Sequence, residues 1–482
     1  MKQTIGKRLK QKLKKSADFI VQNIILSNGK NIELFYIDNM IDKNLVSKEI
    51  ISKLLNMPYD GNINIDAIQK TISVVGTKKD YGYEKAESNI LAGFVVVIAD
   101  WFEDSVFISC PCQGYQLRAV TEPPTAAVQK GPREGFTEDL NTNISLVRRR
   151  LKSPDLRVEE VKAGKYTDTK IMLIYVDSIA DPKVVNEVRN RVSKINIDGI
   201  VDSFYVESLI EPKKSTIFKQ VGNTEKPDIA VAKILEGRVA IVVDGSPMVL
   251  TVPYIFMEDL QSGDDYYGHA AHASFIRIIR VLGMIISITL PGIYVALQSF
   301  HFGVLPIDFL ISLQNSIEGL SFPPLIEILI VLFLFEILNE ASVRMPKYSG
   351  MALSIVGALV LGDTAVKAGI ISPPAVIMVA ISGITLFTVP GQISIATLLR
   401  LLFTIIGGIA GFYGLLVGFM FLIAYLMTLD SFGTAYFAPY APNIESDKKD
   451  GIIKRRLAVF KTRPHSIPNI NNVRQRDDES TN

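Results

Sequence analysis

Residues 281–300 read VLGMIISITLPGIYVALQSF, twenty consecutive residues without a charge. A helix of about 20 apolar residues is long enough to cross the roughly 30 Å of hydrocarbon in a bilayer. The stretch follows a charge-rich half of the chain, and the 482 residues together carry a net charge of only +2. This shift in composition predicts a soluble half followed by a membrane half, and the small net charge argues against a nucleic-acid partner.

The membrane half contains further long apolar segments, and one shorter apolar segment lies between them. Residues 351–362 are apolar but too few to span a bilayer alone, which predicts a re-entrant half-helix. An alternative with six crossings, in which 303–315 and 350–369 both span, stays open. The main prediction is four spanning helices, at 281–300, about 324–338, 373–390 and about 401–429.

Basic residues set the expected direction of insertion. Arg277 and Arg280 precede the first spanning segment, and Arg344 and Lys347 follow the second. The loop between these two segments contains no Lys or Arg. Because loops rich in Lys and Arg stay in the cytoplasm, the soluble half and the C-terminal tail are both predicted to be cytoplasmic.

The soluble half contains two pairs of similar segments. IELFYIDNMIDKNLV begins at Ile32 and IMLIYVDSIADPKVV at Ile171, and each reads as an apolar strand ending in Asp before an amphipathic helix. NILAGFVVVIADWFEDSVFIS begins at Asn89 and KILEGRVAIVVDGSPMVLTVP at Lys233, and each reads as a helix end, a Gly and two strands. We therefore expect two duplicated α/β lobes, which gives an α+β cytoplasmic half joined to a transmembrane helical bundle.

These patterns divide the chain into six parts. The expected boundaries are a basic N-terminal tail at 1–19, a first lobe at 20–118, a linker at 119–134, a second lobe at 135–262, a transmembrane domain at 276–430 and a disordered cytoplasmic tail at 443–482.

The soluble half offers no catalytic set. No His precedes His269, and no Gly-rich phosphate loop follows a strand, so we expect neither an enzyme nor a cofactor. Cys110 and Cys112 lack the further ligands that a zinc site needs and are predicted to be ordinary thiols. A cleft between the two lobes could hold a ligand, although the sequence points to no binding residue in it.

Small residues recur along two membrane segments. Such stripes let another backbone approach closely, either within one chain or between subunits, and both interpretations stay open. The first stripe is Gly350, Ser354, Ala358 and Gly362, and the second is Gly407, Gly411, Gly414 and Gly418.

Acidic residues also lie within the membrane half. Those in or beside the predicted membrane helices are Glu327, Glu336, Glu340 and Asp363. A charge inside a bilayer is costly, so it normally faces a partner or water. One interpretation is neutralised pairs at i, i+4, such as Glu340 with Arg344 and Asp363 with Lys367. The other is a water-lined path whose acidic groups favour cations.

Several long motifs resemble the A subunit of GerA-type spore germinant receptors, in order along the chain. They are GPREGFTEDLNTNISLVRRRLKSPDL (131–156), EGRVAIVVDGSPMVLTVPYIF (236–256), DDYY (264–267), SFPP (321–324) and SFGTAYFAPYAP (431–442). The resemblance implies a multi-pass protein in contact with the lipid of the spore inner membrane. Its implied partners are a nutrient-binding B subunit and a C subunit lipoprotein.

The resemblance also implies a function in spore germination, and it indicates which residues would line a pore. A subunits of this family are thought to form an oligomeric, pentameric channel that opens on nutrient binding and releases cations. Leu359, Val360, Gly362 and Asp363 match the segment that lines or borders the pore. Lys367 departs from the family pattern, in which an acid is common nearby, and is a further gate candidate. The competing hypothesis is a non-conducting signal-relay scaffold or a transporter component of the receptor.

Overall fold

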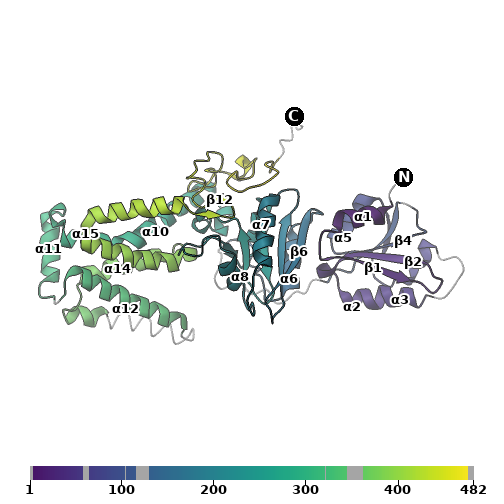
Figure 1. The fold of residues 1–482 in the computed structure, drawn as a ribbon, viewed down its shortest axis with the longest axis horizontal. Coiled ribbons are helices and arrows are strands. Elements are labelled where there is room, and N and C mark those ends of the chain that lie inside the picture. The colour runs from purple at the N-terminus through teal and green to yellow at the C-terminus, as the bar shows by residue number, and fades with distance from the viewer. Residues whose placement is uncertain are drawn as a thin grey trace.

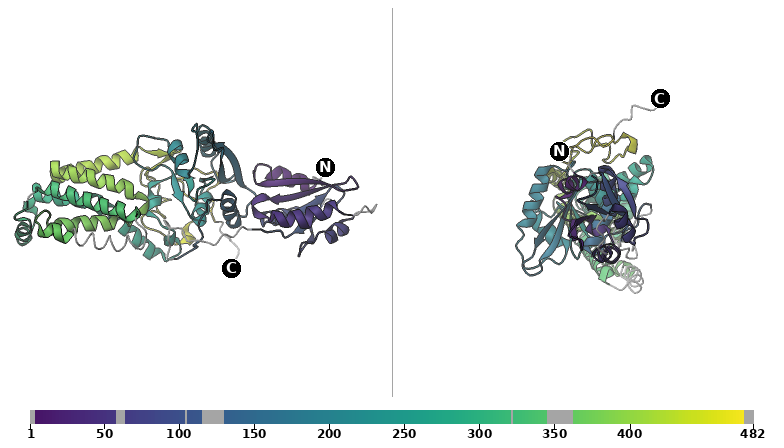
Figure 2. Two further views of the ribbon diagram at one scale, coloured as in Figure 1. Left: turned by 90° about the horizontal axis from the view of Figure 1, so that it is seen from below. Right: turned by 90° about the vertical axis from the view of Figure 1, so that its right-hand side faces the viewer.

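The structure is a computed structural model that describes residues 4–57, 64–103, 105–114, 130–320, 322–344 and 362–475. A first α/β lobe, a second α/β lobe and an elongated helical bundle follow one another along the long axis (Figure 1). Seen from below, the same three parts appear in series, and the C-terminal segment returns to the middle of the molecule (Figure 2). The bundle therefore adjoins the second lobe and lies away from the first.

The first lobe is an antiparallel sheet of five strands in the order β1-β2-β4-β5-β3, with helices packed against it. Its inner strands are rich in β-branched residues, as in the VVVIA of β4, and these pack well on a pleated surface. The elements are α1 Ile5–Leu13, β1 Phe19–Ile25, β2 Asn31–Ile37, α2 Lys43–Val46, α3 Ser52–Leu55, α4 Ile65–Thr71, β3 Lys78–Tyr81, α5 Tyr83–Leu91, β4 Val95–Ala99 and β5 Val106–Cys110.

The N-terminal segment is part of this lobe, so the expectation of a basic tail over 1–19 is wrong. Ile5, Leu9 and Leu13 recur every fourth residue of α1 and are all buried in the core. The basic residues between them point outward, and Lys10 pairs with Glu33 of β2. An amphipathic face hidden among lysines explains why composition alone suggested a tail.

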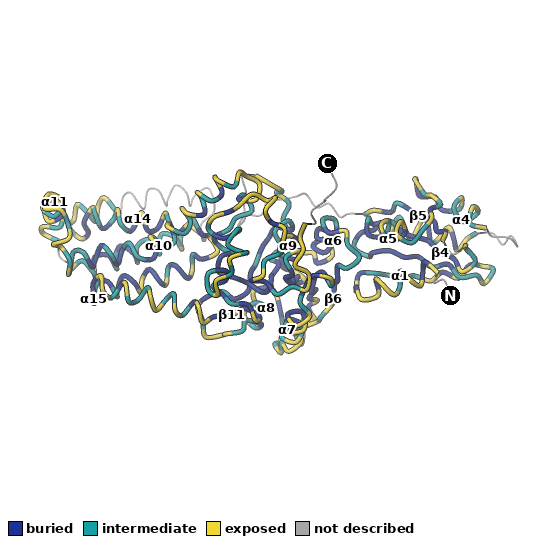
Figure 3. Tube along the Cα trace, turned by 90° about the horizontal axis from the view of Figure 1, so that it is seen from above, coloured by how far each residue is buried: buried dark blue, intermediate teal, exposed yellow. Residues whose placement is uncertain are grey.

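The second lobe has a five-stranded antiparallel sheet in the order β6-β7-β9-β10-β8, which repeats the strand order of the first lobe. Most of its strand residues are buried, as are those of the first sheet (Figure 3). The elements are α6 Leu140–Arg150, β6 Leu156–Ala163, β7 Thr169–Val176, α7 Pro182–Ser193, α8 Ser203–Ile210, β8 Gly222–Thr224, α9 Pro227–Leu235, β9 Val239–Val243 and β10 Val249–Val252.

The helical bundle begins after a short 3-10 turn, Phe256–Leu260. Two of its helices are long and apolar enough to cross a membrane, Ala270–Ser299 and Pro390–Met427. The segment 303–315 does not run along the bundle, because α11 lies across its far end (Figure 1). The helices are α10 Ala270–Ser299, α11 Ile307–Ile317, α12 Pro324–Arg344, α14 Pro373–Leu386 and α15 Ile393–Met427, and residues 362–367 are also helical.

Helix α15 folds back on itself, which corrects the expectation of one continuous helix over 401–429. Gly411 interrupts it with φ 62° and ψ −153°, a conformation open to glycine and strained for other residues. The rings of Phe403 and Phe419 lie 6.5 Å apart, although a straight helix would separate residues sixteen positions apart by about 24 Å. The segment is therefore a hairpin with arms 393–410 and 412–427.

Residues 443–475 of the C-terminal segment pack against the rest of the chain, so the expected disorder over 443–482 is wrong for these residues. After a small hairpin of β11 Asp430–Ser431 and β12 Thr434–Ala435, the chain returns over the second lobe. Ile467 is fully buried there, and the backbone of Ile470 bonds to Ile179. Few apolar residues anchor this segment, and composition therefore suggested a solvated tail.

Candidate functional site

Part of the predicted pore segment lies outside the described residues. This applies to Leu359 and Val360, and to the first three members of the small-residue stripe, Gly350, Ser354 and Ala358. Gly362, which the structure does describe, has open space where a side chain would begin.

Asp363 and Lys367 form an ion pair on the outside of the bundle. Lys367 Nζ lies 2.6 Å from Asp363 Oδ2, and the two side chains are 74% and 55% exposed, respectively. Arg344 and Glu340 make the same i, i+4 contact at 2.6 Å and are also more than half exposed. Both local pairs considered from the sequence therefore form, and both lie on the surface of a single chain.

Glu336 instead points inward to a cation far away in the sequence. It accepts a hydrogen bond from the guanidinium of Arg400 in α15, which is 1% exposed. Arg400 also donates to Ser382 of α14 at 3.3 Å, and Ser382 donates to the Ser287 carbonyl of α10 at 2.8 Å. This network connects four helices around a buried guanidinium and a partly exposed carboxylate, so the cation in the interior has both a counter-charge and hydrogen-bond partners.

Glu327 is also buried but has a different partner. Its Oε1 accepts from the backbone N–H of Ser372 at 2.5 Å, at the N-terminus of α14, where helix N–H groups lack partners within the helix. Tyr294 lies 3.4 Å from the Ser372 hydroxyl and accepts a bond from Gln298 at 2.8 Å. The three acids of α12 thus occupy three separate environments and do not line one path within this chain.

The second glycine stripe packs within the chain. A methyl group on Gly407 would collide with the carbonyl oxygen of Gly292 in α10, so the two helices touch there through their backbones. Gly411 is the reversal point of the α15 hairpin. Gly414 and Gly418 face Ile406 of the opposite arm.

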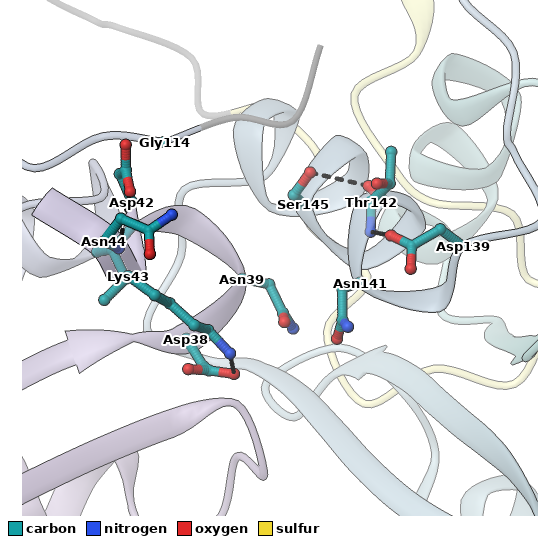
Figure 4. A pocket seen from close by; sticks show the side chains of 11 residues that line it. Asp38, Asn39, Asp42, Lys43, Asn44, Gly114, Asp139, Asn141, Thr142 and Ser145 are labelled. Carbon is teal, nitrogen blue, oxygen red and sulfur yellow. Dashed lines mark hydrogen bonds and ion pairs between the residues drawn. The ribbon is translucent and has the colours of Figure 1, made fainter. Parts of the chain in front are cut away.

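A cleft of about 480 Å³ separates the two lobes. Asn39 of the first lobe and Asn141 of the second face one another across it (Figure 4). An amide side chain both donates and accepts hydrogen bonds, so this cleft suits a small neutral polar ligand. The remaining lining residues are Asp38, Ile41, Asp42, Lys43, Asn44, Gly114, Asp139, Thr142 and Ser145.

The acids of this cleft are already engaged. Asp38 pairs with Lys43 at 2.7 Å, Asp42 caps α2, and Asp139 caps α6 through the N–H of Thr142 at 2.7 Å. These local contacts fix the shape of the cleft, and among the described residues the side-chain amides of Asn39 and Asn141 have no hydrogen-bond partner. The helix caps could have been predicted from the sequence, but the opposition of two asparagines a hundred residues apart could not.

One buried ion pair joins the two lobes beside the cleft. Arg148 of α6 donates to both oxygens of Asp18, at 2.8 and 2.7 Å, and both side chains are almost completely buried. The backbone N–H of Ala17 also donates to the Val158 carbonyl at 2.8 Å. A bidentate contact of this kind restricts how the lobes can rotate against one another.

A second polar junction joins the second lobe to the bundle. The side-chain amide of Gln392, directly before α15, donates to Asp259 Oδ2 at 2.8 Å and to the Tyr254 hydroxyl at 3.2 Å. Lys219 Nζ lies 3.6 Å from Asp259 Oδ1. The C-terminal end of the α15 hairpin also contacts the second lobe, since the Tyr425 ring lies 5.9 Å from that of Phe218.

Three acids, Glu207, Glu211 and Asp259, interact electrostatically beside Lys219 on the lobe side of this junction. Burial, with repulsion from Glu211 and Asp259, raises the pKa of Glu207 to about 7 against the attraction of Lys219. Among the described residues, the Oε2 atom of Glu207 is buried without a hydrogen-bond partner. Glu207 is therefore the carboxyl of this cluster that takes up a proton near neutral pH.

The two cysteines lie in the core of the first lobe. Cys110 ends β5, and both thiols are free and buried. Burial raises the pKa of each thiol to about 12, so neither forms a reactive thiolate at neutral pH.

Comparison with known proteins covers nearly the whole chain. Residues 7–466 match the family described as Bacillus/Clostridium GerA spore germination protein. Spore germination protein KA of Bacillus subtilis (strain 168) is 39% identical over 480 residues, 98% of this chain and 87% of that protein. Spore germination protein B1 of the same strain is 34% identical over 451 residues, 92% of each chain. A solved structure, the N-terminal domain of the A subunit of the Bacillus megaterium spore germinant receptor GerK3, is similar at 29% identity and a TM-score of 0.41, over 52% of this chain and 93% of that one.

Proposed function

The chain belongs to the GerA family of spore germination proteins, and from this premise we propose that it is the A subunit of a nutrient germinant receptor. In this proposal it assembles with a nutrient-binding B subunit and a C subunit lipoprotein in the spore inner membrane. Several copies, five in the simplest ring, form a cation channel that opens when nutrient binds and so triggers germination. The lobes and the C-terminal segment lie in the cytoplasm, and the two lobes derive from a duplication.

The exposed pair of Asp363 and Lys367 is the observation that carries the channel proposal. The bundle around it is apolar: between residues 373 and 427 the only charged side chain is Arg400, which is buried. Exposed charges on such a surface need water or a polar partner, because lipid solvates them poorly. A water-filled path between neighbouring subunits supplies that water.

Six crossings fit this proposal better than four. α10 leaves the second lobe and ends at the far side of the bundle, and α12 returns from there to Arg344. Gly369 lies beside Gly319 at the far end, and residues 345–361 between Arg344 and this point lie outside the described residues. α14 and the two arms of α15 add three crossings, and an even total keeps both ends of the chain on one side.

Recording from the assembled receptor tests the proposal. The complex of A, B and C subunits is reconstituted in a planar bilayer, and the current is recorded before and after nutrient is added. We expect a cation current that depends on nutrient and on the A subunit. A complex that supports germination in spores but never conducts in the bilayer would rule out the channel.

The junction at Gln392 favours a second candidate, a relay that couples the lobes to the bundle without conducting. Gln392 and Tyr425 connect both ends of the α15 hairpin to the second lobe. A relay predicts that breaking this junction abolishes germination while no nutrient-dependent current exists even in the wild type. The same recordings therefore separate the two candidates.

A further inference from the structure

A short segment after the bundle combines exposed apolar and basic side chains. Ile453, Leu457 and Val459 are 63%, 56% and 38% exposed, respectively. Arg455 and Arg456 lie between the first two and are exposed as well, and no ion pair links either arginine to an acid among the described residues. Exposed apolar side chains interleaved with arginines are typical of a surface that meets a membrane interface.

This segment is fixed beside the first turns of α10. The backbone N–H of Lys454 donates to the hydroxyl of Ser274 at 3.0 Å, and that hydroxyl donates back to the Lys454 carbonyl at 3.1 Å. Arg277 of α10 also donates to the Gly451 carbonyl at 2.7 Å. Ser274 precedes Val281 by seven residues, or about 10 Å along a helix, which places the segment near the depth of lipid headgroups.

The neighbouring face of α10 continues the apolar surface. Phe275, Ile278 and Leu282 are all exposed on this helix, which is long and apolar enough to cross a membrane. The C-terminal segment that carries Leu457 lies over the same end of the bundle, next to the second lobe (Figure 1). The exposed apolar side chains of α10 and of the C-terminal segment thus both lie where the bundle meets the second lobe.

We propose that residues 453–461 dock on the anionic lipid headgroups of the bilayer that α10 crosses, with Leu457 inserted and Arg455 and Arg456 bound to phosphates. The proposal rests on the proposed membrane function. The two arginines match the negative charge of an anionic leaflet, and the segment is continuous with a predicted spanning helix. The segment thereby holds the base of the bundle, and with it the junction to the second lobe, at a fixed depth.

Spin labels on the full chain in lipid nanodiscs test this docking. One label is attached at Leu457→Cys, a second at Leu282→Cys as a report of insertion, and a third at Ile470→Cys as an aqueous control, where the C-terminal segment packs on the second lobe. The native thiols are buried and do not compete for the label. Collision rates with oxygen and with a water-soluble nickel chelate are compared in phosphatidylcholine alone and with added phosphatidylglycerol.

The expected pattern differs among the three sites. Leu282 is lipid-exposed in both nanodiscs and Ile470 is aqueous in both, while Leu457 moves into the lipid phase when anionic lipid is present. Arg455→Gln with Arg456→Gln should lower the equilibrium constant for docking, measured at Leu457, about 25-fold, at about fivefold per arginine. Lys183→Gln with Lys194→Gln, an equal charge change on the second lobe, should leave it unchanged.

The failures can be told apart. An aqueous Leu282 label contradicts the proposed membrane insertion itself. A lipid-exposed Leu282 with an aqueous Leu457 overturns the docking proposal alone. Two further results also overturn it. The Leu457 label could be as lipid-exposed in neutral nanodiscs as in anionic ones, or it could stay lipid-exposed after both arginines are replaced. In either case the segment does not bind an anionic headgroup.

Discussion

The Gln392 side chain donates to Asp259 Oδ2 at 2.8 Å, and this bond joins the α15 hairpin to the second lobe. Asp259 also faces Lys219 through its other oxygen, at 3.6 Å. A rotation of the second lobe therefore acts directly on the first residue before α15. In the channel proposal, this is the route by which the soluble half acts on the bundle.

Replacement of Gln392 by Leu should weaken this coupling. The change leaves the largely enclosed Asp259 carboxylate, 12% exposed, with fewer donors, which costs about 1–3 kcal/mol. We expect α15 to lose hydrogen-exchange protection in its first turn, and spores carrying the variant to germinate poorly although the protein is present. Gln314→Leu on the exposed face of α11 is the matched control. If both variants behave alike, the junction does not couple the two parts.

Replacement of Glu207 by Gln should change how stability depends on pH. Because the pKa of Glu207 is raised to about 7, the folded state binds a proton that the unfolded state has released, and wild-type stability falls as pH rises from about 4.5 to 7. The variant has no carboxyl to ionise. The free energy of unfolding of the variant should therefore exceed that of the wild type by about 1–3 kcal/mol at pH 8, and the two should be equal near pH 4.

Hydrogen exchange of α8 in the full chain measures this effect. Protection at pH 8, corrected for intrinsic exchange, should be greater in Glu207→Gln than in the wild type, and the difference should vanish at low pH. Asp202 caps the same helix, and Asp202→Asn serves as the control for loss of a charge elsewhere on α8. A constant difference across pH would contradict the raised pKa.

Replacement of Arg400 by Met should be destabilising. It leaves Glu336 without its cation, and because the Glu336 side chain is 34% exposed, the cost should lie below the roughly 3–5 kcal/mol that is typical of a fully buried pair. Glu336→Met in the same chain should recover most of the loss, since two apolar side chains then pack together. Thermal unfolding in detergent gives the comparison. Arg344→Met, which breaks an exposed pair, should cost less than about 1 kcal/mol.

Replacement of Gly407 by Ala should separate α10 from α15. The new methyl group meets the backbone of Gly292, which cannot move aside as a side chain could, and overpacking of this kind costs about 1–3 kcal/mol. Gly362→Ala is the matched control, because the same methyl group meets open space there. Equal unfolding temperatures for the two variants would show that the close contact is absent.

Local relationships were the part of the fold that sequence could predict. The i, i+4 pairs at Asp363 and at Glu340 follow from helical spacing alone, and the two α/β lobes follow from strand and turn patterns. The partner of Glu336 is 64 residues away and could not be found by spacing. Gly411 looked like one of four equivalent glycines, and only tertiary contacts show that the chain reverses there.

The terminal segments were misjudged for a related reason. Leu9 is surrounded by lysines and Ile467 stands among polar residues, so neither segment is apolar on average. Each is nonetheless fixed by a few side chains that fit a surface formed elsewhere in the chain. Such anchoring depends on the partner surface, which a sequence read in order does not reveal.

The reversal potential of the reconstituted receptor across a salt gradient shows whether Asp363 borders a conducting path. If it does, the wild type passes a nutrient-dependent current that favours cations, and Asp363→Asn shifts the reversal potential toward zero while Glu340→Gln leaves it in place. The absence of any nutrient-dependent current, or a reversal potential unchanged in Asp363→Asn, would exclude a cation path beside Asp363.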